Sequence, residues 1–343
     1  MNTATPPPGH TWRAKDVTLH LVHASPRLVT RAEKEALIGG GVSYGELLER
    51  EEAPSDIQQQ AYGDALTRTG ARLGAQLASL AAHLARDGGP VTLVSLPRAG
   101  LPVGAVLVRV LRAWSVDAEH HSVSIVRGVG VDRVALDAVV ARRGMPGLAF
   151  VDGWTGKGSI RDTLRQTLLG HPAAQAPLAV VSDPAHAADL AATFDDALLP
   201  HAALNSTVSG LLSRTFLVDG GRHGAVTWGH LAAQDVTNAY LDTLTRLTLA
   251  AMPTPLPTHP TGPDPAALAL ELARVPGQPF DANKVKPSVG EATRVFLRRH
   301  PARLLVRRGE DPEVAHLLAL AAVGDVPVEV VPTLPYRAVA VAR

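Results

Sequence analysis

The sequence predicts an α/β protein in which a parallel sheet carries helices on both faces and a small α/β domain follows. Between residues 91 and 192, short apolar runs alternate with stretches of helical length, the pattern of a parallel sheet covered by helices. Eight of the 28 residues from 252 to 279 are proline, which is typical of a stiff, extended linker. Residues 280–343 then alternate again, over a length that suits one small domain.

Each element follows from its residues. A helix is predicted over residues 56–86, because leucines recur at spacings of three, four and seven before Asp87-Gly88-Gly89-Pro90 ends the run. The predicted strands of the sheet are short and apolar or alternating: residues 91–95, 121–127, 148–151 and 177–182. The predicted helices beside them are residues 101–113, 132–143, 159–169 and 185–192.

Three segments are expected in the chain. Residues 1–251 form the sheet domain, of which 1–90 are an N-terminal extension and helix, and the first 55 residues receive no role. Residues 252–279 are the proline-rich linker, with one short helix over 266–275. The C-terminal domain spans 280–343, with a helix from near Ser288, a strand over 303–306, a helix over 311–323 and a strand over 328–331.

Composition excludes several classes of protein. The 343 residues carry a formal net charge of +1, so the chain as a whole is not a basic nucleic-acid coat. It contains no cysteine, which removes disulfide scaffolds, thiolate metal sites and cysteine nucleophiles. No apolar run reaches the roughly 18 residues of a membrane helix. The first residues lack the features of a secretory signal, so we expect a cytoplasmic protein without a membrane partner.

The glycine-rich loop after residues 148–151 is the most informative segment. An apolar strand ends in an acid, and a turn of small residues opens the next helix. Backbone N–H groups of such a turn, together with the positive end of the helix, bind phosphate. The alternative is an ordinary strand–turn–helix junction in which glycines only turn the chain sharply. The predicted contacts are Asp152, Gly153, Thr155, Gly156, Lys157, Gly158 and Ser159.

A second loop follows the first sheet strand. Arg98, Ala99 and Gly100 lie there, and the fork of an arginine suits a pyrophosphate. The alternative for Arg98 is a surface arginine that caps a turn. Farther along, Arg127 and Arg133 lie between the two loops, where they either bind an anion or are simply solvated.

A run of small polar residues follows at 204–215. Asn205, Ser206, Thr207 and Ser209 either line the pocket of a second substrate or form a polar turn and helix cap. His223 is a weaker candidate, because a lone loop histidine is commonly polar surface.

The C-terminal domain opens on a basic stretch. Between Lys284 and Arg308 there are eight basic residues and one acid. Like charges at positions 294 and 298 of a helix repel, and an external polyanion relieves that cost. The basic residues that such a polyanion would meet include Lys284, Lys286, Arg294 and Arg298; the alternative is a solvated basic helix on a docking domain.

The two loops resemble those of type I phosphoribosyltransferases. The resemblance implies that 5-phosphoribosyl 1-diphosphate (PRPP) binds with Mg²⁺ over Asp152, which contacts the sugar and the metal. It places the 5′-phosphate on Thr155–Ser159, the diphosphate on the Arg98 loop, and a catalytic role on Asp152 and on Arg127 in a mobile lid. Gly153 stands where that family has a second acid.

The tail resembles the Pelota-type RNA-binding domain, with Gly290 where that family usually has asparagine. This resemblance implies RNA contacts at Gly290, Glu291, Thr293 and Arg294, with Lys284 and Lys286 nearby. The whole chain resembles a bacterial family found with tellurium-resistance and stress-response gene clusters, some members of which are labelled cysteine protease StiP. The segments that carry this resemblance are residues 150–159, 122–128, 204–215 and 286–299. Because the chain has no cysteine, we expect that this label does not apply to it.

The first functional hypothesis is therefore a Mg²⁺-dependent phosphoribosyltransferase that moves ribose 5-phosphate from PRPP to a nitrogen nucleophile of a base or nucleoside-like metabolite. The alternative is a non-catalytic regulator that senses PRPP or a nucleotide and binds structured RNA. A structural adaptor is the third. A homodimer is compatible with each, and the sequence does not name the acceptor.

Overall fold

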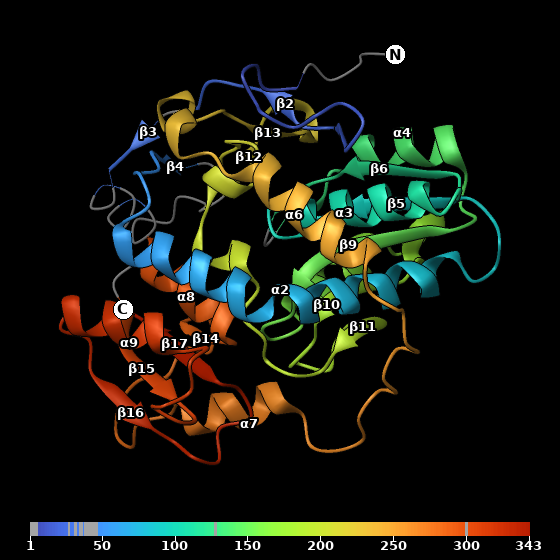
Figure 1. Cartoon of the computed structure of the whole chain (residues 1–343). Helices are drawn as coiled ribbons and strands as arrows, with labels where there is room; N and C mark the ends of the chain where they lie inside the picture. The colour runs from blue at the N-terminus through green and yellow to red at the C-terminus, as the bar shows by residue number, and fades with distance from the viewer. Residues whose placement is uncertain are drawn as a thin grey trace.

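The computed structural model describes residues 6–26, 28–30, 33, 37, 47–126, 129–298 and 301–343. Its centre is a parallel sheet of six strands in the order β1-β6-β5-β9-β10-β11 (Figure 1). The strands are β1 Thr18–Leu19, β6 Ala118–Ser122, β5 Val91–Ser95, β9 Leu148–Trp154, β10 Leu178–Ser182 and β11 Leu190–Thr193. The sheet and the helices between its strands confirm the predicted α/β class.

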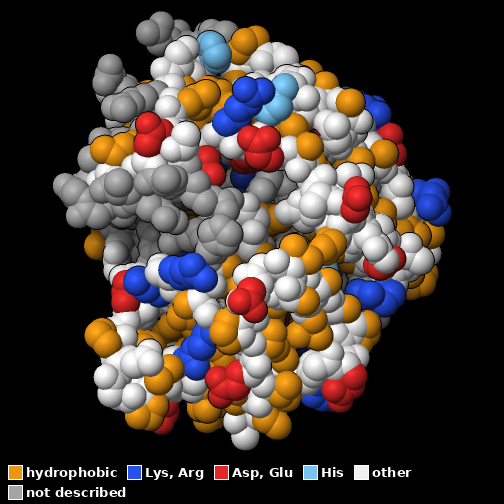
Figure 2. All heavy atoms as spheres, turned by 90° about the vertical axis from the view of Figure 1, so that its left-hand side faces the viewer, with side chains coloured by type: hydrophobic (Ala, Val, Ile, Leu, Met, Phe, Trp, Pro, Cys, Tyr) orange, Lys and Arg blue, Asp and Glu red, His pale blue; other side chains and the backbone are white. Residues whose placement is uncertain are grey.

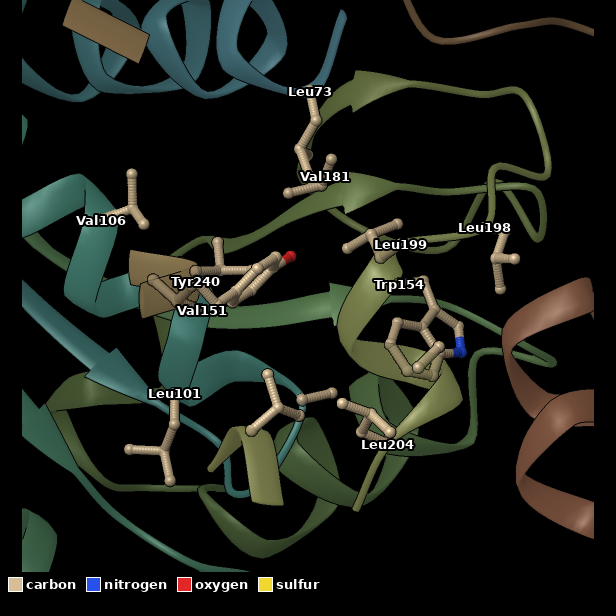
Figure 3. Packing of buried hydrophobic residues seen from close by; sticks show 14 of the residues in the cluster. Leu73, Leu101, Val106, Val151, Trp154, Val181, Leu198, Leu199, Leu204 and Tyr240 are labelled. Atoms are coloured by element: carbon tan, nitrogen blue, oxygen red, sulfur yellow. The ribbon is translucent and has the colours of Figure 1, made fainter. Parts of the chain in front are cut away.

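Helices cover both faces of this sheet. One face carries α2 Asp56–Ala85, α3 Gly100–Ala113 and α6 Thr237–Leu249, and the other carries α4 Arg133–Arg143 and α5 Ser159–Thr167. Alternate strand residues serve the two cores, so Leu93 packs with the first group and Val94 with the second. Figure 3 shows the first core from close by, with Val151 and Val181 of neighbouring strands facing Tyr240 of α6.

Helix α2 begins and packs as its sequence predicts. The Ser55 hydroxyl accepts the N–H of Gln58 while the Gln58 side chain accepts the N–H of Ser55, which is a reciprocal capping box. The leucine stripe is buried against the sheet domain. A Cβ on Gly74 would lie 2.9 Å from the backbone of Leu247, so α2 and α6 approach very closely there.

Two predicted elements of the sheet domain are wrong. Residues 185–192 were expected to be a helix but contain β11, an edge strand parallel to β10. The alanines favour a helix, yet Asp183 accepts the N–H groups of Ala187 and Ala188 and holds a turn instead. The expected strand over 121–127 is divided between β6 and β7 Ile125–Val126, which pairs with β8 Gly130–Val131.

The N-terminal segment, to which the sequence assigned no role, builds small sheets around the domain. Besides β1, it supplies β2 Val22–His23, β3 Leu28–Val29 and β4 Leu48–Glu49. Strand β2 pairs with β13 His223–Ala225, which also pairs with β12 Phe216–Leu217, and β3 pairs with β4. Short 3₁₀ helices fill the connections: η2 Pro172–Gln175, η3 Pro200–Ala203, η4 Ser206–Val208, η5 Asp219–Gly221 and η6 Gly229–Gln234.

The C-terminal domain has a four-stranded sheet in the order β14-β17-β15-β16. Its elements are β14 Val285–Pro287, α8 Val289–Arg298, β15 Pro301–Val306, α9 Ala315–Val323, β16 Val328–Val330 and β17 Ala338–Ala342. Helix α7 Pro265–Leu272, which the sequence placed in the linker, buries Ala269 against this domain. The proline-rich segment before α7 runs extended between the two domains (Figure 1).

The C-terminal domain packs directly on the sheet domain. Val289 and Ala292 of α8 and Leu317 of α9 belong to the same buried cluster as the α2 side of the sheet. The two domains therefore share a core. None of the helices in the described ranges is long and apolar enough to cross a membrane.

Candidate functional site

The carboxyl ends of β5 and β9 open onto a cavity of about 290 Å³. Because parallel strands end at one edge of a sheet, their loops meet there, as the sequence predicts. Five of the lining residues come from β14 and α8 of the C-terminal domain, which the sequence did not predict. Of the residues predicted to bind PRPP, those lining the cavity are Arg98, Ala99, Asp152, Thr155, Gly156, Lys157, Gly158 and Ser159.

Asp152 follows four buried residues of β9 and lines the cavity. One carboxylate oxygen accepts the N–H of Gly153 at 2.8 Å. Burial raises the pKa of Asp152 to about 7, although Arg294 and the Gly153 N–H act in the opposite direction. A carboxyl group with this pKa takes up or releases a proton near neutrality.

Gly153 and Gly100 lie behind the cavity wall and are needed for close packing. A Cβ on Gly100 would lie 2.2 Å from the carbonyl oxygen of Val151, so helix α3 starts directly against β9. A Cβ on Gly153 would lie 3.2 Å from Nε2 of His201 and 3.3 Å from the carbonyl oxygen of Ala99. A side chain at position 153 would therefore be in tight contact with both neighbours, which favours glycine there.

Hydrogen bonds to neighbouring segments hold the loop from 155 to 159 in place. The Thr155 hydroxyl donates to Asp183 at 2.5 Å, so this side chain shapes the loop. Gly158 has a left-handed backbone (φ 78°) at the N-cap of α5, where the first helical N–H groups begin. Lys157 donates to the carbonyl oxygen of Ala282 at 2.5 Å, which ties the loop to the C-terminal domain.

Arg98 is buried and already has an anionic partner. Its guanidinium donates to Glu51 at 2.5 Å and to the carbonyl oxygen of Leu212 at 2.9 Å. Burial opposes ionisation of Glu51, but Arg98, Arg298 and Ser206 outweigh it and keep the pKa of Glu51 below its usual value. The sequence analysis missed Glu51, because nothing in the local run Glu51-Glu52-Ala53 points to an arginine 47 residues away.

A second cavity of about 150 Å³ lies on the other side of Arg98 and Arg298, and both arginines line both cavities. Asn205, Ser206 and Thr207 line it, as predicted for a second-substrate pocket. The Asn205 side chain accepts from Arg98 at 3.3 Å and from Arg298 at 3.1 Å. Within the described residues, the buried hydroxyls of Ser206 and Thr207 have no hydrogen-bond partner.

Ser209 differs from this group. Its hydroxyl donates to the carbonyl oxygen of Asn205 at 2.8 Å, and its own carbonyl oxygen accepts from Trp12. Ser209 therefore supports the backbone of the second cavity and is absent from its lining.

Several of the residues predicted to contact RNA line the cavity. Glu291, Arg294 and Arg298 face the cavity, and Lys286 lines it from β14. Gly290 lies against Trp154, where a Cβ would come within 2.6 Å of the indole ring. Figure 3 shows Trp154 at the end of the buried cluster that lies next to the C-terminal helices.

Thr293 and Lys284 are the two remaining residues that were predicted to contact RNA. Thr293 is buried and donates to the carbonyl oxygen of Val289, with His316 2.7 Å away on its other side. Lys284 is exposed and lies outside the cavity lining. On the face shown in Figure 2, basic and acidic side chains are interspersed among apolar ones.

Among the described residues, the remaining sequence candidates Arg133 and His223 do not line the cavity. Arg127 lies outside the described residues. Arg133 is exposed at the start of α4, and His223 is buried beside the Ser124 hydroxyl at 2.9 Å. Within the described ranges, no three His, Asp or Glu side chains gather as a metal cluster.

Comparisons with known proteins place the chain in a family. A family model described as "Tellurite-like stress resistance cysteine protease StiP" matches residues 10–245, and one described as "PELOTA RNA binding domain" matches residues 278–343. A curated protein of Acinetobacter baylyi named "Cysteine protease StiP" is 32% identical over 96% of this chain and 92% of its own length.

Solved structures match only distantly. A hypoxanthine phosphoribosyltransferase from Trypanosoma cruzi in complex with IMP is 13% identical over 43% of this chain and 77% of its own, with a TM-score of 0.26. A glutamine mutant from a study of an invariant aspartic acid in HPRTs is 13% identical over 35% of this chain and 75% of its own, with a TM-score of 0.28. Likeness at this level says nothing about activity.

One expectation needs correction. The absence of cysteine led us to expect that the cysteine-protease label does not apply, but both the matching family model and the matching relative carry that name. The chain itself has no cysteine. With the model match over residues 10–245 and a 32% identical relative aligned along nearly its full length, the chain belongs to the StiP family, and its C-terminal domain is of the Pelota type.

Proposed function

We propose that the larger cavity binds a phosphorylated ribose of the PRPP class and that the chain transfers its phosphoribosyl group to a nitrogen nucleophile of a base-like molecule. The observation that carries this proposal is the convergence of two strand-end loops on one cavity. One loop brings Asp152 and the start of α5, and the other brings Arg98.

Phosphate suits the loop that opens α5. The first N–H groups of a helix have no partner within it and carry partial positive charge. Gly158 and Ser159 line the cavity at this point, so a 5′-phosphate here lies at the positive end of the helix. Asp152, at the neighbouring strand end, is then placed to accept hydrogen bonds from ribose hydroxyls.

The reaction asks little of the protein beyond positioning and charge. Breaking the bond from the ribose C1 to the diphosphate builds negative charge on the leaving group, which cationic side chains stabilise. Asp152 and Glu291 are the carboxylates of the cavity, and they suit a Mg²⁺ that arrives on the diphosphate, since such ions take one or two protein carboxylates. Such an ion would neutralise the phosphate oxygens.

We assign the smaller cavity as the binding site of the molecule that accepts the phosphoribosyl group. Asn205 offers an amide, and Ser206 and Thr207 offer buried hydroxyls without a partner in the described part of the chain. Buried polar groups without partners favour a ligand that pairs with them.

Titration calorimetry on the full chain tests the binding step. PRPP is added with and without Mg²⁺ to the native chain, to Asp152→Asn and to Asp325→Asn, which changes an acid outside the cavity lining. We expect Mg²⁺-dependent binding that Asp152→Asn weakens at least tenfold and Asp325→Asn leaves unchanged. No heat with PRPP, or equal affinity in all three, overturns the assignment.

One observation favours the alternative function, a non-catalytic sensor. The strand end offers one carboxylate, Asp152, where the phosphoribosyltransferases that the loops resemble have two, and a Cβ at position 153 would already be in tight contact with His201 and Ala99. PRPP binding without release of diphosphate in the presence of purine and pyrimidine bases would favour a sensor of PRPP or a nucleotide, coupled to RNA through the Pelota-type domain.

A further inference from the structure

We propose that the C-terminal domain supplies the anion-binding arginine of the larger cavity. Arg294 of α8, with Arg298 one turn away, binds a phosphate group of the ligand, so the ligand bridges the two domains. This inference rests on the proposed function, because it names the residue that reads the phosphorylated ligand.

The first argument is the position of Arg294. Its guanidinium carbon lies 4.4 Å from the centre of the Trp154 ring, and the side chain lines the cavity with 23% of its surface exposed. Among the described residues it pairs with Glu291, whose carboxylate oxygen is 3.4 Å away on the same helix. That distance is long for a charge-assisted hydrogen bond, which is typically about 2.7–2.9 Å.

The second argument is the charge of the cavity wall. Its acidic members are Asp152 and Glu291, and burial raises the pKa of Asp152 to about 7. Of the six basic side chains that line the cavity from the described residues, three belong to the C-terminal domain, so this domain provides half of their positive charge. The basic lining residues are Arg98, Lys157, Arg161, Lys286, Arg294 and Arg298.

The environment of Arg294 also favours an anion. Burial lowers the pKa of Arg294 from its ordinary value, which means that the cation is poorly solvated where it stands. Arg298 adds a like charge nearby and itself donates to Asn205. A phosphate group in the cavity relieves both costs, since it replaces lost hydration with charge-assisted hydrogen bonds.

The third argument is that α8 is held in a fixed position. Asp196 of the sheet domain accepts the N–H of Val289 with both carboxylate oxygens at 3.0 Å, at the start of α8. Gly290 leaves no space against Trp154, and the Tyr336 hydroxyl donates to the carbonyl oxygen of Gly156 at 2.8 Å. Arg294 is therefore preorganised, which reduces the entropy lost when a ligand binds.

The experiment measures binding of PRPP and, separately, of inorganic pyrophosphate to the full chain by calorimetry. The variants are Arg294→Met, Arg294→Lys and the control Arg308→Met, an exposed arginine of the same domain outside this cavity. We expect Arg294→Met to weaken both probes about 10- to 100-fold. Arg294→Lys should restore part of the affinity, and Arg308→Met should stay within about twofold of the native chain.

A second measurement separates ligand binding from folding. Trp154 lines the cavity beneath Arg294, so we expect PRPP to change its fluorescence, and Trp154→Phe to remove that change. Urea denaturation reports whether Arg294→Met still folds cooperatively. If Arg294→Met is unfolded, the affinity of Arg294→Lys is compared with that of the native chain instead. Lysine keeps a positive charge at position 294 but lacks the guanidinium.

The possible failures are distinct. If the native chain binds neither probe, the proposed function fails and this inference fails with it. If the native chain binds PRPP, Asp152→Asn loses it and a folded Arg294→Met binds normally, the inference alone is overturned. The same holds if Arg294→Met lowers affinity for a structured RNA while PRPP affinity is unchanged.

Discussion

Arg98 and Glu51 form a buried ion pair with 2.5 Å between Nη1 and Oε1, although 47 residues separate them in the chain. Their side chains are 5% and 17% exposed. The second oxygen of Glu51 accepts the N–H of Ser206 at 3.1 Å, so the pair connects the N-terminal segment to both cavities. This contact gives the end of the N-terminal segment a place in the site.

Replacing Glu51 with glutamine tests that pair. Glu51→Gln leaves the Arg98 cation buried without its counter-ion, and breaking one side of a buried pair typically costs about 3–5 kcal/mol. We expect a loss of stability of that order in urea denaturation. Glu52→Gln, an exposed neighbour, should change stability by less than about 0.5 kcal/mol. Equal stability of the two variants would show that the ion pair contributes nothing.

Gly290 tests the seating of α8 on Trp154. A Cβ at this position would lie 2.6 Å from the indole, so Gly290→Ala must push the helix away from the ring. Overpacking of this kind costs about 1–3 kcal/mol. Gly309→Ala is the matched control, because a Cβ there has no atom within 4 Å. Denaturation curves of both variants give their free energies of unfolding. A Gly290→Ala variant as stable as the native chain would contradict the close packing.

The raised pKa of Asp152 predicts a pH dependence of stability. The folded state holds the proton up to about pH 7, while the unfolded chain releases it near pH 4. The native chain therefore has the full contribution below about pH 4 and loses up to about 1.4 kcal/mol per pH unit as the pH rises toward 7. Asp152→Asn cannot ionise, so we expect its stability relative to the native chain to improve from pH 5 to pH 8.

Urea denaturation at those two pH values checks this prediction. The difference between the native chain and Asp152→Asn cancels the contributions of the other titrating groups. A difference that stays constant with pH would show that Asp152 is ionised in the folded protein across this range.

Arg337 tests the contact between the domains. Its guanidinium pairs with Asp195 of the sheet domain at 2.6 Å and with Asp311 at 2.5 Å. Arg337→Met leaves Asp311, 6% exposed, without its cation, so we expect a loss of about 3 kcal/mol or more. Arg13→Met removes an exposed pair with Asp242 and should cost no more than about 1 kcal/mol. Comparable losses in the two variants would show that the Asp311 pair and the Asp195 pair across the domains together contribute no more than one exposed pair.

Much of the fold was open to prediction because its causes are local. Leucine spacing and a Ser/Gln capping box define α2, and apolar runs between turns define β5, β9 and β10. The failure at 185–192 has a non-local cause: pairing with β10 and the Asp183 turn override the helix preference of the alanines.

The residues of the candidate site likewise divide into those that the local sequence predicts and those that only tertiary contacts bring together. The sequence by itself determined the strand-end loops with Asp152 and Arg98, because residue type and position after a strand are enough to place a side chain at the sheet edge. Only the tertiary structure decided that Glu51 forms an ion pair with Arg98 and that Arg294 and Asp152 line the same cavity. These pairs join segments whose contact depends on burying two apolar surfaces in one shared core, and no local pattern encodes that docking.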